Sequence, residues 1–127
     1  MYKIIVCDLD ETLISRDRTI STENIEAIRK ATEAGVKFVP CTGRGYNSVH
    51  HTTAQLGLFD QKDQYVISYN GGAITENKDE RQLYFQGITF EEAEAIYKRG
   101  LTYDHICIHI YTPCLLYTSP RPRDTER

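Results

Sequence analysis

The hydrophobic and polar positions at the start of the chain predict a buried strand followed by a polar loop. Residues 4–7 form a nearly continuous apolar run that is rich in β-branched side chains. Such a run is typical of a strand covered on both faces, as in parallel sheets. Asp8 and Asp10 come directly after it. Because residues i and i+2 of an extended chain point to the same side, we expect both acids to converge at the edge where open α/β sheets bind ligands.

The next elements alternate between helix and strand. Ser21 and Gly35 bracket a stretch of apolar side chains at helical spacing, as an N-cap and a terminator. Residues 36–41 form a second apolar run, residues 46–56 have a second helical pattern, and residues 65–69 read as a third strand. Strand, helix and strand in this order indicate right-handed crossovers and a parallel sheet.

The pattern changes after the third strand. Residues 70–72, Asn-Gly-Gly, predict a tight turn. Residues 73–75 and 82–85 flank a polar stretch and predict a hairpin. Residues 89–100 have helical spacing, and residues 104–111 alternate as a half-exposed strand does.

Composition and charge exclude several classes of function. The chain has 127 residues, enough for one domain or part of one. A net charge of −3 offers no basic surface for nucleic acid. No apolar run reaches membrane-spanning length and no signal-peptide pattern opens the chain. The four cysteines are scattered without a C-x-x-C pair, which argues against zinc and favours the reducing cytoplasm. Composition says nothing of the oligomeric state.

Two polar clusters are candidates for chemistry, and each has a plainer interpretation. Asp8 and Asp10 are either solvated acids at the start of a loop, or a helix cap, or a site for a divalent cation and a phosphate. A carboxylate can also attack phosphorus directly. Thr42, Gly43 and Arg44 are either a plain loop or a cradle for an oxyanion, since a glycine lets the backbone approach a ligand at the start of a helix.

These clusters carry a resemblance to a known family. Asp8-Leu9-Asp10-Glu11-Thr12-Leu13 resembles DxDx[TV]L, the first motif of the haloacid dehalogenase (HAD) superfamily of phosphatases. Thr42-Gly43-Arg44 resembles its second motif, in the form typical of the Cof-type (subfamily IIB) hydrolases, and residues 68–74 resemble the "NGA" signature of that branch. Glu11 and Gly45 depart from the usual residues, Gly and Pro, at positions that touch no reacting group.

The resemblance implies the fold class and the organisation of the chain. It implies an α/β, HAD-like Rossmannoid core with a parallel sheet, of which the first three strands are present, and the beginning of an inserted α+β cap domain. Residues 1–87 would be the N-terminal part of the core and residues 88–112 the start of the cap. Residues 113–127 resemble the translation of a transposon-library sequencing adaptor, so we expect a non-native, disordered tail.

The family's later motifs, a lysine and an acidic pair, lie beyond the cap. We therefore expect this chain to be an N-terminal fragment that is inactive by itself. In the family, strands from beyond the cap flank the first strand. Without them, we expect that strand to be an exposed apolar edge that promotes aggregation.

The resemblance also implies the roles of single residues. Asp8 would be the nucleophile and Asp10 the general acid and base, and both would hold Mg²⁺. The residues that the resemblance implies in binding phosphate or substrate are Leu9, Thr12, Thr42, Gly43, Arg44, Asn70 and Gly71. The parent protein would then be a Mg²⁺-dependent phosphatase that hydrolyses a small phosphorylated metabolite, such as a sugar phosphate, through an aspartyl-phosphate.

Three alternatives stay open. A phosphomutase or phosphotransferase on the same fold shares the first two motifs. A phosphotransfer receiver module would need an acceptor Asp after the third strand, where Tyr69 and Asn70 stand. The fragment could also be a non-functional gene remnant.

Overall fold

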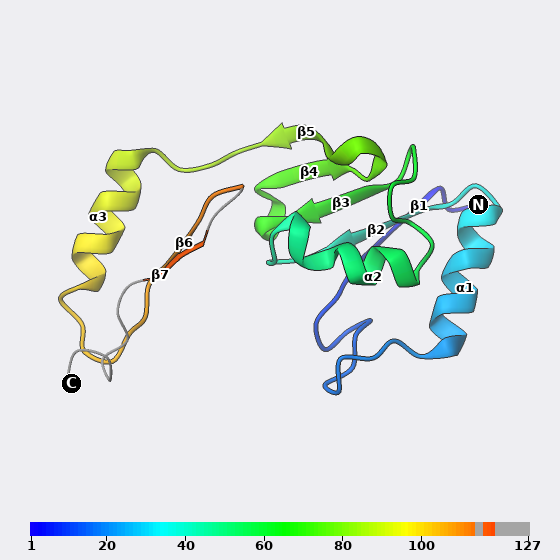
Figure 1. Ribbon diagram of the computed structural model, residues 1–127, viewed down its shortest axis with the longest axis horizontal. Helices are drawn as coiled ribbons and strands as arrows, with labels where there is room; N and C mark the ends of the chain where they lie inside the picture. The colour runs from blue at the N-terminus through cyan, green and yellow to red at the C-terminus, as the bar shows by residue number, and fades with distance from the viewer. Residues whose placement is uncertain (114–115, 119–127) are drawn as a thin grey trace. The chain divides into compact units, whose positions relative to one another are not determined.

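The structure is a computed structural model that describes residues 1–113 and 116–118. It divides into two compact units, Met1–Gln86 and Gly87–Arg127. Figure 1 shows the sheet and helices of the first unit, and the helix and hairpin of the second.

The first unit is built from five strands, two α-helices and three short 3-10 helices. The strands are β1 (Ile4–Asp8), β2 (Lys37–Cys41), β3 (Tyr65–Ser68), β4 (Ala73–Glu76) and β5 (Arg81–Phe85). The helices are α1 (Thr22–Glu33), α2 (His50–Gln55), η1 (Tyr46–Val49), η2 (Tyr69–Gly71) and η3 (Lys78–Glu80).

The five strands form one sheet in the order β1-β2-β3-β4-β5. β1, β2 and β3 are parallel, whereas β4 and β5 continue the sheet as an antiparallel hairpin. The predicted parallel strands and the predicted hairpin are thus confirmed. Since Asp8 pairs with Cys41 at the end of the β1–β2 ladder, the loops that follow both strands leave the same edge of the sheet.

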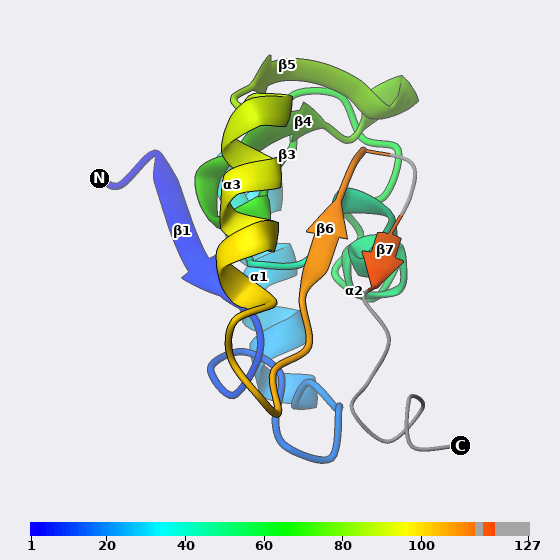
Figure 2. The same cartoon turned by 90° about the vertical axis from the view of Figure 1, so that its left-hand side faces the viewer.

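β1 is one edge strand of this sheet, as Figure 2 shows, and β5 is the other. The side chains of Ile4 and Val6 are 55% and 56% exposed, so the expectation of a strand covered on both faces is wrong. The expectation of an exposed apolar edge is confirmed. The physical reason is the order of the sheet, because β1 has a neighbouring strand on one side only.

The core of the first unit lies under the parallel strands. α1 begins where the sequence predicts, with the Ser21 side chain accepting the Asn24 N–H at 3.2 Å, and Gly35 follows it with a φ of 87°. Its buried residue is Ile28. The other members of the core cluster are Leu9, Leu13, Ile14, Ile20, Phe38, Tyr46, Val49, Leu56, Leu58 and Val66.

The predicted helix over residues 46–56 is divided in two. η1 leads into α2 at Val49, whose φ of −111° and ψ of 4° are not α-helical. The side chain of Val49 is fully buried at this point. We attribute the local backbone geometry to the burial of Val49 at the junction. The periodicity of the sequence does not reveal that burial.

The second unit contains α3 (Phe90–Gly100) and a hairpin of β6 (His109–Tyr111) and β7 (Leu116–Thr118). A capping box between Thr89 and Glu92 starts α3, as the sequence indicates. No described helix of the chain has the length and hydropathy that a membrane span requires.

One expectation for this unit is corrected. The strand predicted over residues 104–111 is too long, because His105 has a φ of 64°, which breaks an extended chain, and only His109–Tyr111 are paired. Within the predicted tail, Leu116–Thr118 pair with β6 as a strand, and a non-native, disordered tail from residue 113 stays a prediction. Residues 114–115 and 119–127 of that predicted tail lie outside the described residues.

Candidate active site

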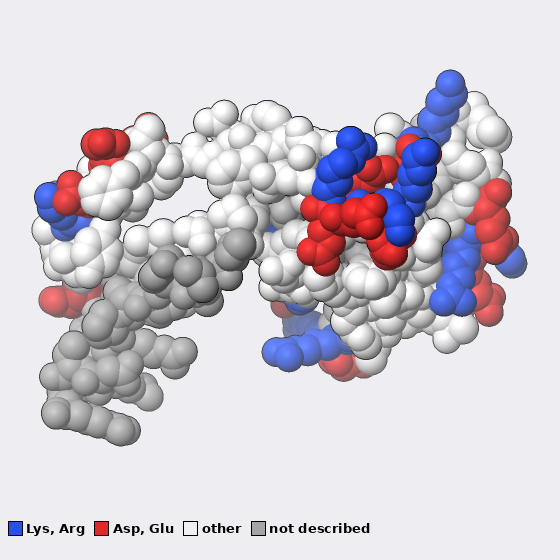
Figure 3. Space-filling view, turned by 45° about the horizontal axis from the view of Figure 1, so that its top comes forward, with Lys and Arg blue, Asp and Glu red and all other residues white. Residues whose placement is uncertain are grey.

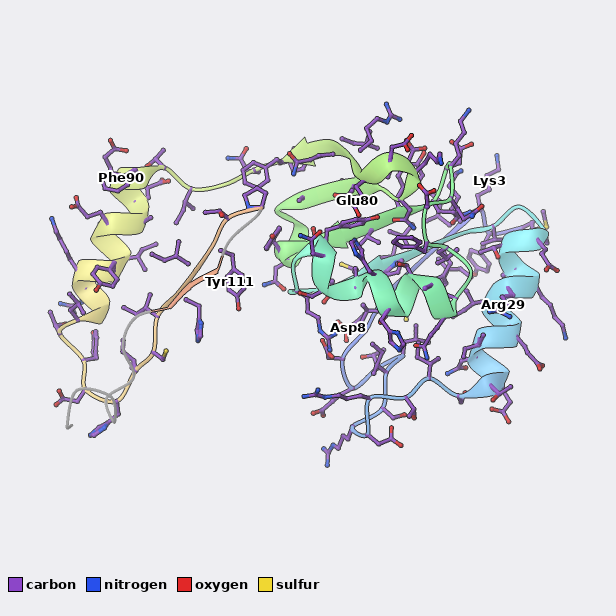
Figure 4. All side chains as sticks on the ribbon, in the orientation of Figure 1. Lys3, Asp8, Arg29, Glu80, Phe90 and Tyr111 are labelled. Carbon is purple, nitrogen blue, oxygen red and sulfur yellow. The ribbon has the colours of Figure 1, made fainter. Side chains whose placement is uncertain are left out.

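The loop after β1 presents Asp8 at the carboxyl end of the parallel strands (Figure 4). The Leu9 side chain is fully buried, and its carbonyl accepts the N–H groups of Thr12 at 3.2 Å and Ile14 at 2.8 Å. This fold of the loop brings the Thr12 hydroxyl to the Asp8 Oδ2, to which it donates at 2.7 Å. Among the described residues, nothing hydrogen-bonds to the other Asp8 oxygen.

A bidentate ion pair joins the first two loops of the site. The Arg44 guanidinium donates to both oxygens of Asp10, from Nε to Oδ2 at 2.9 Å and from its terminal nitrogen to Oδ1. The side chains of Asp10 and Arg44 are 50% and 37% exposed, so water reaches the pair. Forked pairs of this kind fix geometry more than they stabilise the fold when they are exposed.

The loop after β2 is bound to its neighbours through the backbone of Thr42. The Thr42 N–H donates to the Ile67 carbonyl at 2.9 Å and so extends the pairing of β2 with β3. The Thr42 hydroxyl accepts the Arg44 N–H at 3.1 Å. Since a hydroxyl also has one proton to donate, this buried side chain keeps a donor for an anion.

A left-handed turn after β3 supports the same loop. Tyr69, Asn70 and Gly71 have φ values of 52°, 55° and 95°. The Asn70 N–H donates to the Thr42 carbonyl and the Tyr69 N–H donates to the Arg44 carbonyl, each at 3.0 Å. A non-glycine residue in this region is uncommon and marks a local constraint. The turn therefore fixes the backbone on both sides of residue 43.

Two glycines of the β2 loop lie against that turn. A Cβ at Gly43 would lie 3.0 Å from the Asn70 side-chain oxygen, and a Cβ at Gly45 would lie 2.7 Å from the Tyr69 hydroxyl oxygen. The second distance is shorter than real Cβ atoms show. A side chain at residue 45, where the family often has proline, would therefore require the Tyr69 ring to shift.

The structure brings most of the predicted residues together. Contacts within the site connect Asp8 to Thr12, Asp10 to Arg44, and Thr42 to Asn70, with Gly43 beside the Asn70 side chain. Leu9 is different, because its side chain lies in the core and only its backbone can face a ligand. Gly71 contributes the end of the turn.

Two features of the site were not predicted. Neither the Asp10–Arg44 ion pair nor the support from Tyr69 followed from the sequence. The only signal for the second was the Asn-Gly-Gly turn that follows the third strand.

Asp8 and Asp10 are the residues that could hold a Mg²⁺ ion. Mg²⁺ takes oxygen ligands, commonly one or two carboxylates together with water and substrate phosphate. One Asp8 oxygen accepts only the Thr12 hydroxyl, whereas Arg44 binds both Asp10 oxygens. Within the described residues, no group of three or more His, Cys, Asp or Glu side chains could hold a metal. The donor atoms therefore fit Mg²⁺ in type, and further ligands must come from outside this pair.

Cys7 is the other reactive group next to Asp8. Burial raises the pKa of the Cys7 thiol, and the negative charge of Asp8 raises it further. The thiol donates to the Asp8 carbonyl oxygen at 3.2 Å. A thiol that is held protonated is a poor nucleophile, so Cys7 is a weaker candidate for the nucleophile than the carboxylates.

Comparison with known proteins identifies the family. The chain matches the family described as haloacid dehalogenase-like hydrolase over residues 5–126. It belongs to the haloacid dehalogenase-like hydrolases. The resemblance inferred from the three motifs is thereby confirmed, and the receiver module is not the fold of this chain.

Curated relatives and solved structures agree with this family. The chain is 30% identical over 122 residues to phosphatase YwpJ of Bacillus subtilis, covering 96% of this chain and 41% of YwpJ. It is 42% identical over 72 residues to the 5-amino-6-(5-phospho-D-ribitylamino)uracil phosphatase YwtE of the same organism, covering 57% of this chain and 23% of YwtE. A haloacid dehalogenase-like hydrolase structure from B. subtilis has a TM-score of 0.81 at 28% identity, over 97% of this chain and 41% of that chain.

The chain spans less than half the length of these relatives. The match to the family also runs into residues 113–126, which the sequence analysis set apart as a non-native tail.

Proposed function

We propose that this chain carries the nucleophile and the phosphate-binding loops of a Mg²⁺-dependent phosphatase that acts on small phosphomonoesters through an aspartyl-phosphate. The observation that carries the proposal is the position of Asp8. It stands exposed at the end of β1, its Oδ2 is fixed by Thr12, and its second oxygen is uncommitted. Family membership supports phosphate chemistry at this position.

The uncommitted oxygen of Asp8 attacks phosphorus, and the bond from phosphorus to the leaving oxygen breaks. The Thr12 hydroxyl keeps the other oxygen in place and so selects one carboxylate oxygen for attack. Asp8 and a phosphate are both negative, and a Mg²⁺ ion held by Asp8 and Asp10 would screen the two charges. Water then attacks the aspartyl-phosphate and restores the Asp8 carboxylate.

Asp10 moves the protons of both steps, first to the leaving oxygen and then from the attacking water. Its two oxygens are bound by Arg44 in this structure, so the ion pair has to open before Asp10 can act. An arriving phosphate competes with Asp10 for the guanidinium, because arginine binds phosphate oxygens in the same forked geometry. Substrate binding and the release of Asp10 are coupled in this way.

The β2 loop holds the phosphate oxygens. The Thr42 hydroxyl still has its proton to donate, and the Gly43 backbone has no side chain to block an approach. The turn at Tyr69 and Asn70 supports this loop through hydrogen bonds to the Arg44 and Thr42 carbonyls, and the Asn70 side chain lies beside Gly43. Fixed donors of this kind stabilise the charge on a transferring phosphoryl group.

The relatives indicate the class of substrate. One relative is named for a phosphoribitylamino-uracil, another for HMP-PP, and a structure with the same fold is described as a subclass IIB sugar phosphatase. The compounds in these names are small phosphorylated metabolites. We extend only that class to this chain.

Replacement of the nucleophile tests the proposal. In the complete protein, Asp8→Asn should lower the turnover of p-nitrophenyl phosphate with Mg²⁺ by at least about 10³-fold, since an amide cannot form the acyl-phosphate. Chelation by EDTA should have a similar effect in the wild type. The matched control is Asp17→Asn, an exposed aspartate of the same region whose carboxylate binds only Thr19. Near-normal turnover by the Asp8 variant would rule out the nucleophile.

A further inference from the structure

A hollow beside the candidate active site is lined by groups that the proposed chemistry does not use. It has a volume of about 400 Å³ and lies within the first unit. Arg44 forms one wall, so the hollow adjoins the Asp10–Arg44 pair. Arg18 reaches it from the loop after β1, and Ser48, His51 and Gln55 reach it from η1 and α2.

The lining consists of basic, neutral polar and apolar groups. It contains two guanidinium groups, one imidazole, hydroxyls, one amide and the apolar side chain of Ile14, and none of its residues is acidic. Acidic and basic side chains lie together on one face of the molecule (Figure 3), and in this unit Lys78 pairs with Asp60 and Arg81 with Glu76. In the hollow, Arg44 is paired with Asp10, whereas no ion pair among the described residues engages Arg18, which therefore brings an uncompensated positive charge.

Four polar side chains of the lining are also uncommitted. Across the described residues, no hydrogen bond or ion pair engages the side chains of Arg18, Ser48, His51 or Gln55. All four can donate a hydrogen bond, the imidazole in either protonation state. Four unengaged donors around one hollow, without an acid, match an oxyanion such as a phosphate or a carboxylate.

We propose that this hollow, called here the second-anion pocket (Arg18, Arg44, Ser48, His51 and Gln55), binds a second anionic group of the substrate. The inference rests on the proposed function, because it concerns the substrate that reacts at Asp8. It narrows the substrate class to phosphomonoesters that carry another phosphate or a carboxylate. Arg44 belongs to both sites and links the second anion to the opening of the Asp10 pair.

Paired substrates test the pocket in the complete protein. We would compare kcat/KM for glucose 1,6-bisphosphate with that for glucose 6-phosphate, and for 3-phosphoglycerate with that for glycerol 3-phosphate. The wild type should prefer the member with two anionic groups in one of the pairs by about tenfold or more. The pair that shows the preference tells whether the second anion is a phosphate or a carboxylate.

Two variants test whether that preference depends on the pocket. Arg18→Gln and Gln55→Glu should each reduce the preference to about twofold or less, through KM rather than kcat, since they remove a positive charge or add a negative one away from the reacting atoms. Arg16→Gln is the matched control, because Arg16 lies in the same loop, pairs with Glu11 at 3.5 Å and does not line the pocket. It should keep the wild-type preference. The pocket is ruled out if the wild type shows no preference, or if Arg18→Gln and Arg16→Gln show the same preference.

Calorimetry separates this inference from the proposed function. Inorganic pyrophosphate is titrated into the same three proteins, wild type, Arg18→Gln and Arg16→Gln, where no turnover is needed. Arg18→Gln should weaken pyrophosphate binding about tenfold and Arg16→Gln should not. If no phosphate ester is turned over, the proposed function is wrong. The difference in pyrophosphate affinity between Arg18→Gln and Arg16→Gln then decides by itself whether the pocket binds an anion.

Discussion

Glu76 is buried in the first unit yet keeps two charge-stabilising contacts. Its side chain is 6% exposed, and its oxygens accept the Asp63 N–H at 2.9 Å and the Arg81 Nε at 2.9 Å. The hydrogen bond from the Asp63 backbone, and after it that from Arg81, lower the pKa of Glu76 below its usual 4.5. The contact with Arg81 connects the end of β4 to the start of β5, and the contact with Asp63 connects it to the segment before β3.

The lowered pKa predicts how stability depends on pH. A carboxyl whose pKa is lower in the folded state stabilises the fold above its unfolded pKa, and that contribution is lost as pH falls through the folded pKa. Melting temperature should therefore fall as pH decreases below about 5. Glu76→Gln should lower the melting temperature by about 5 °C at pH 7 and flatten the fall at acid pH.

Scanning calorimetry between pH 7 and pH 3 measures both effects. Glu26→Gln serves as the control, since Glu26 is an exposed glutamate of α1. Equal pH profiles for the two variants would contradict the role of Glu76.

Single residues of the site were predictable only where the strand pattern fixes them. Asp8 and Thr42 follow the apolar runs that became β1 and β2, so parallel pairing alone brings them to one edge. The Asp10–Arg44 pair depends on two rotamers, and the support from Tyr69 depends on a positive φ. Neither quantity leaves a periodic trace in a sequence, which is why the sequence did not reveal them.

Elements with a buried face were predicted better than exposed ones. α1 and the β4–β5 hairpin agree with their patterns because one face of each is fixed by packing or by pairing. The strand expected over residues 104–111 failed where nothing buries it, since its described side chains are exposed apart from Ile108. Alternation alone does not keep an exposed segment extended.

The outer edge of β1 predicts self-association. An unpaired apolar strand is a template for another chain, and Ile4 and Val6 present about half of their surface to water. Val6→Lys should raise the protein concentration at which dimers and larger species appear by about tenfold, because it sets a charge on that edge. Sedimentation velocity over a range of concentrations measures this shift.

Ala54→Lys is the control for the added charge. Ala54 is an exposed residue of α2 and lies away from the strand edge. If both lysine variants behave alike, net charge rather than the β1 edge governs association.

At the scale of the whole molecule, burial is unequal between the two units. All members of the core cluster lie in the first unit, whereas no described residue from Gly87 to Pro113 is buried. α3 has 11 residues, which is marginal for a helix without tertiary packing. Stability should therefore be concentrated in Met1–Gln86.

Hydrogen exchange followed by mass spectrometry tests this inequality. Amides of α3 should exchange at least about 100-fold faster than those of β2 and β3, because local opening of an unpacked helix costs little free energy. Amides of α1 supply the internal control, since that helix is packed through Ile28. Protection of α3 equal to that of α1 would show that the second unit has a core of its own.

The order of the sheet has a consequence for how the protein is made. Each strand from β2 to β5 pairs with the strand that precedes it in the chain. A sheet of this kind can grow in the direction of translation, since no strand waits for a distant one. At about 5–20 residues per second, the five strands leave the ribosome within roughly 20 s of the first. Through that interval the outer side of β1 stays unpaired, because every later strand of the unit adds to the opposite side of the nascent sheet.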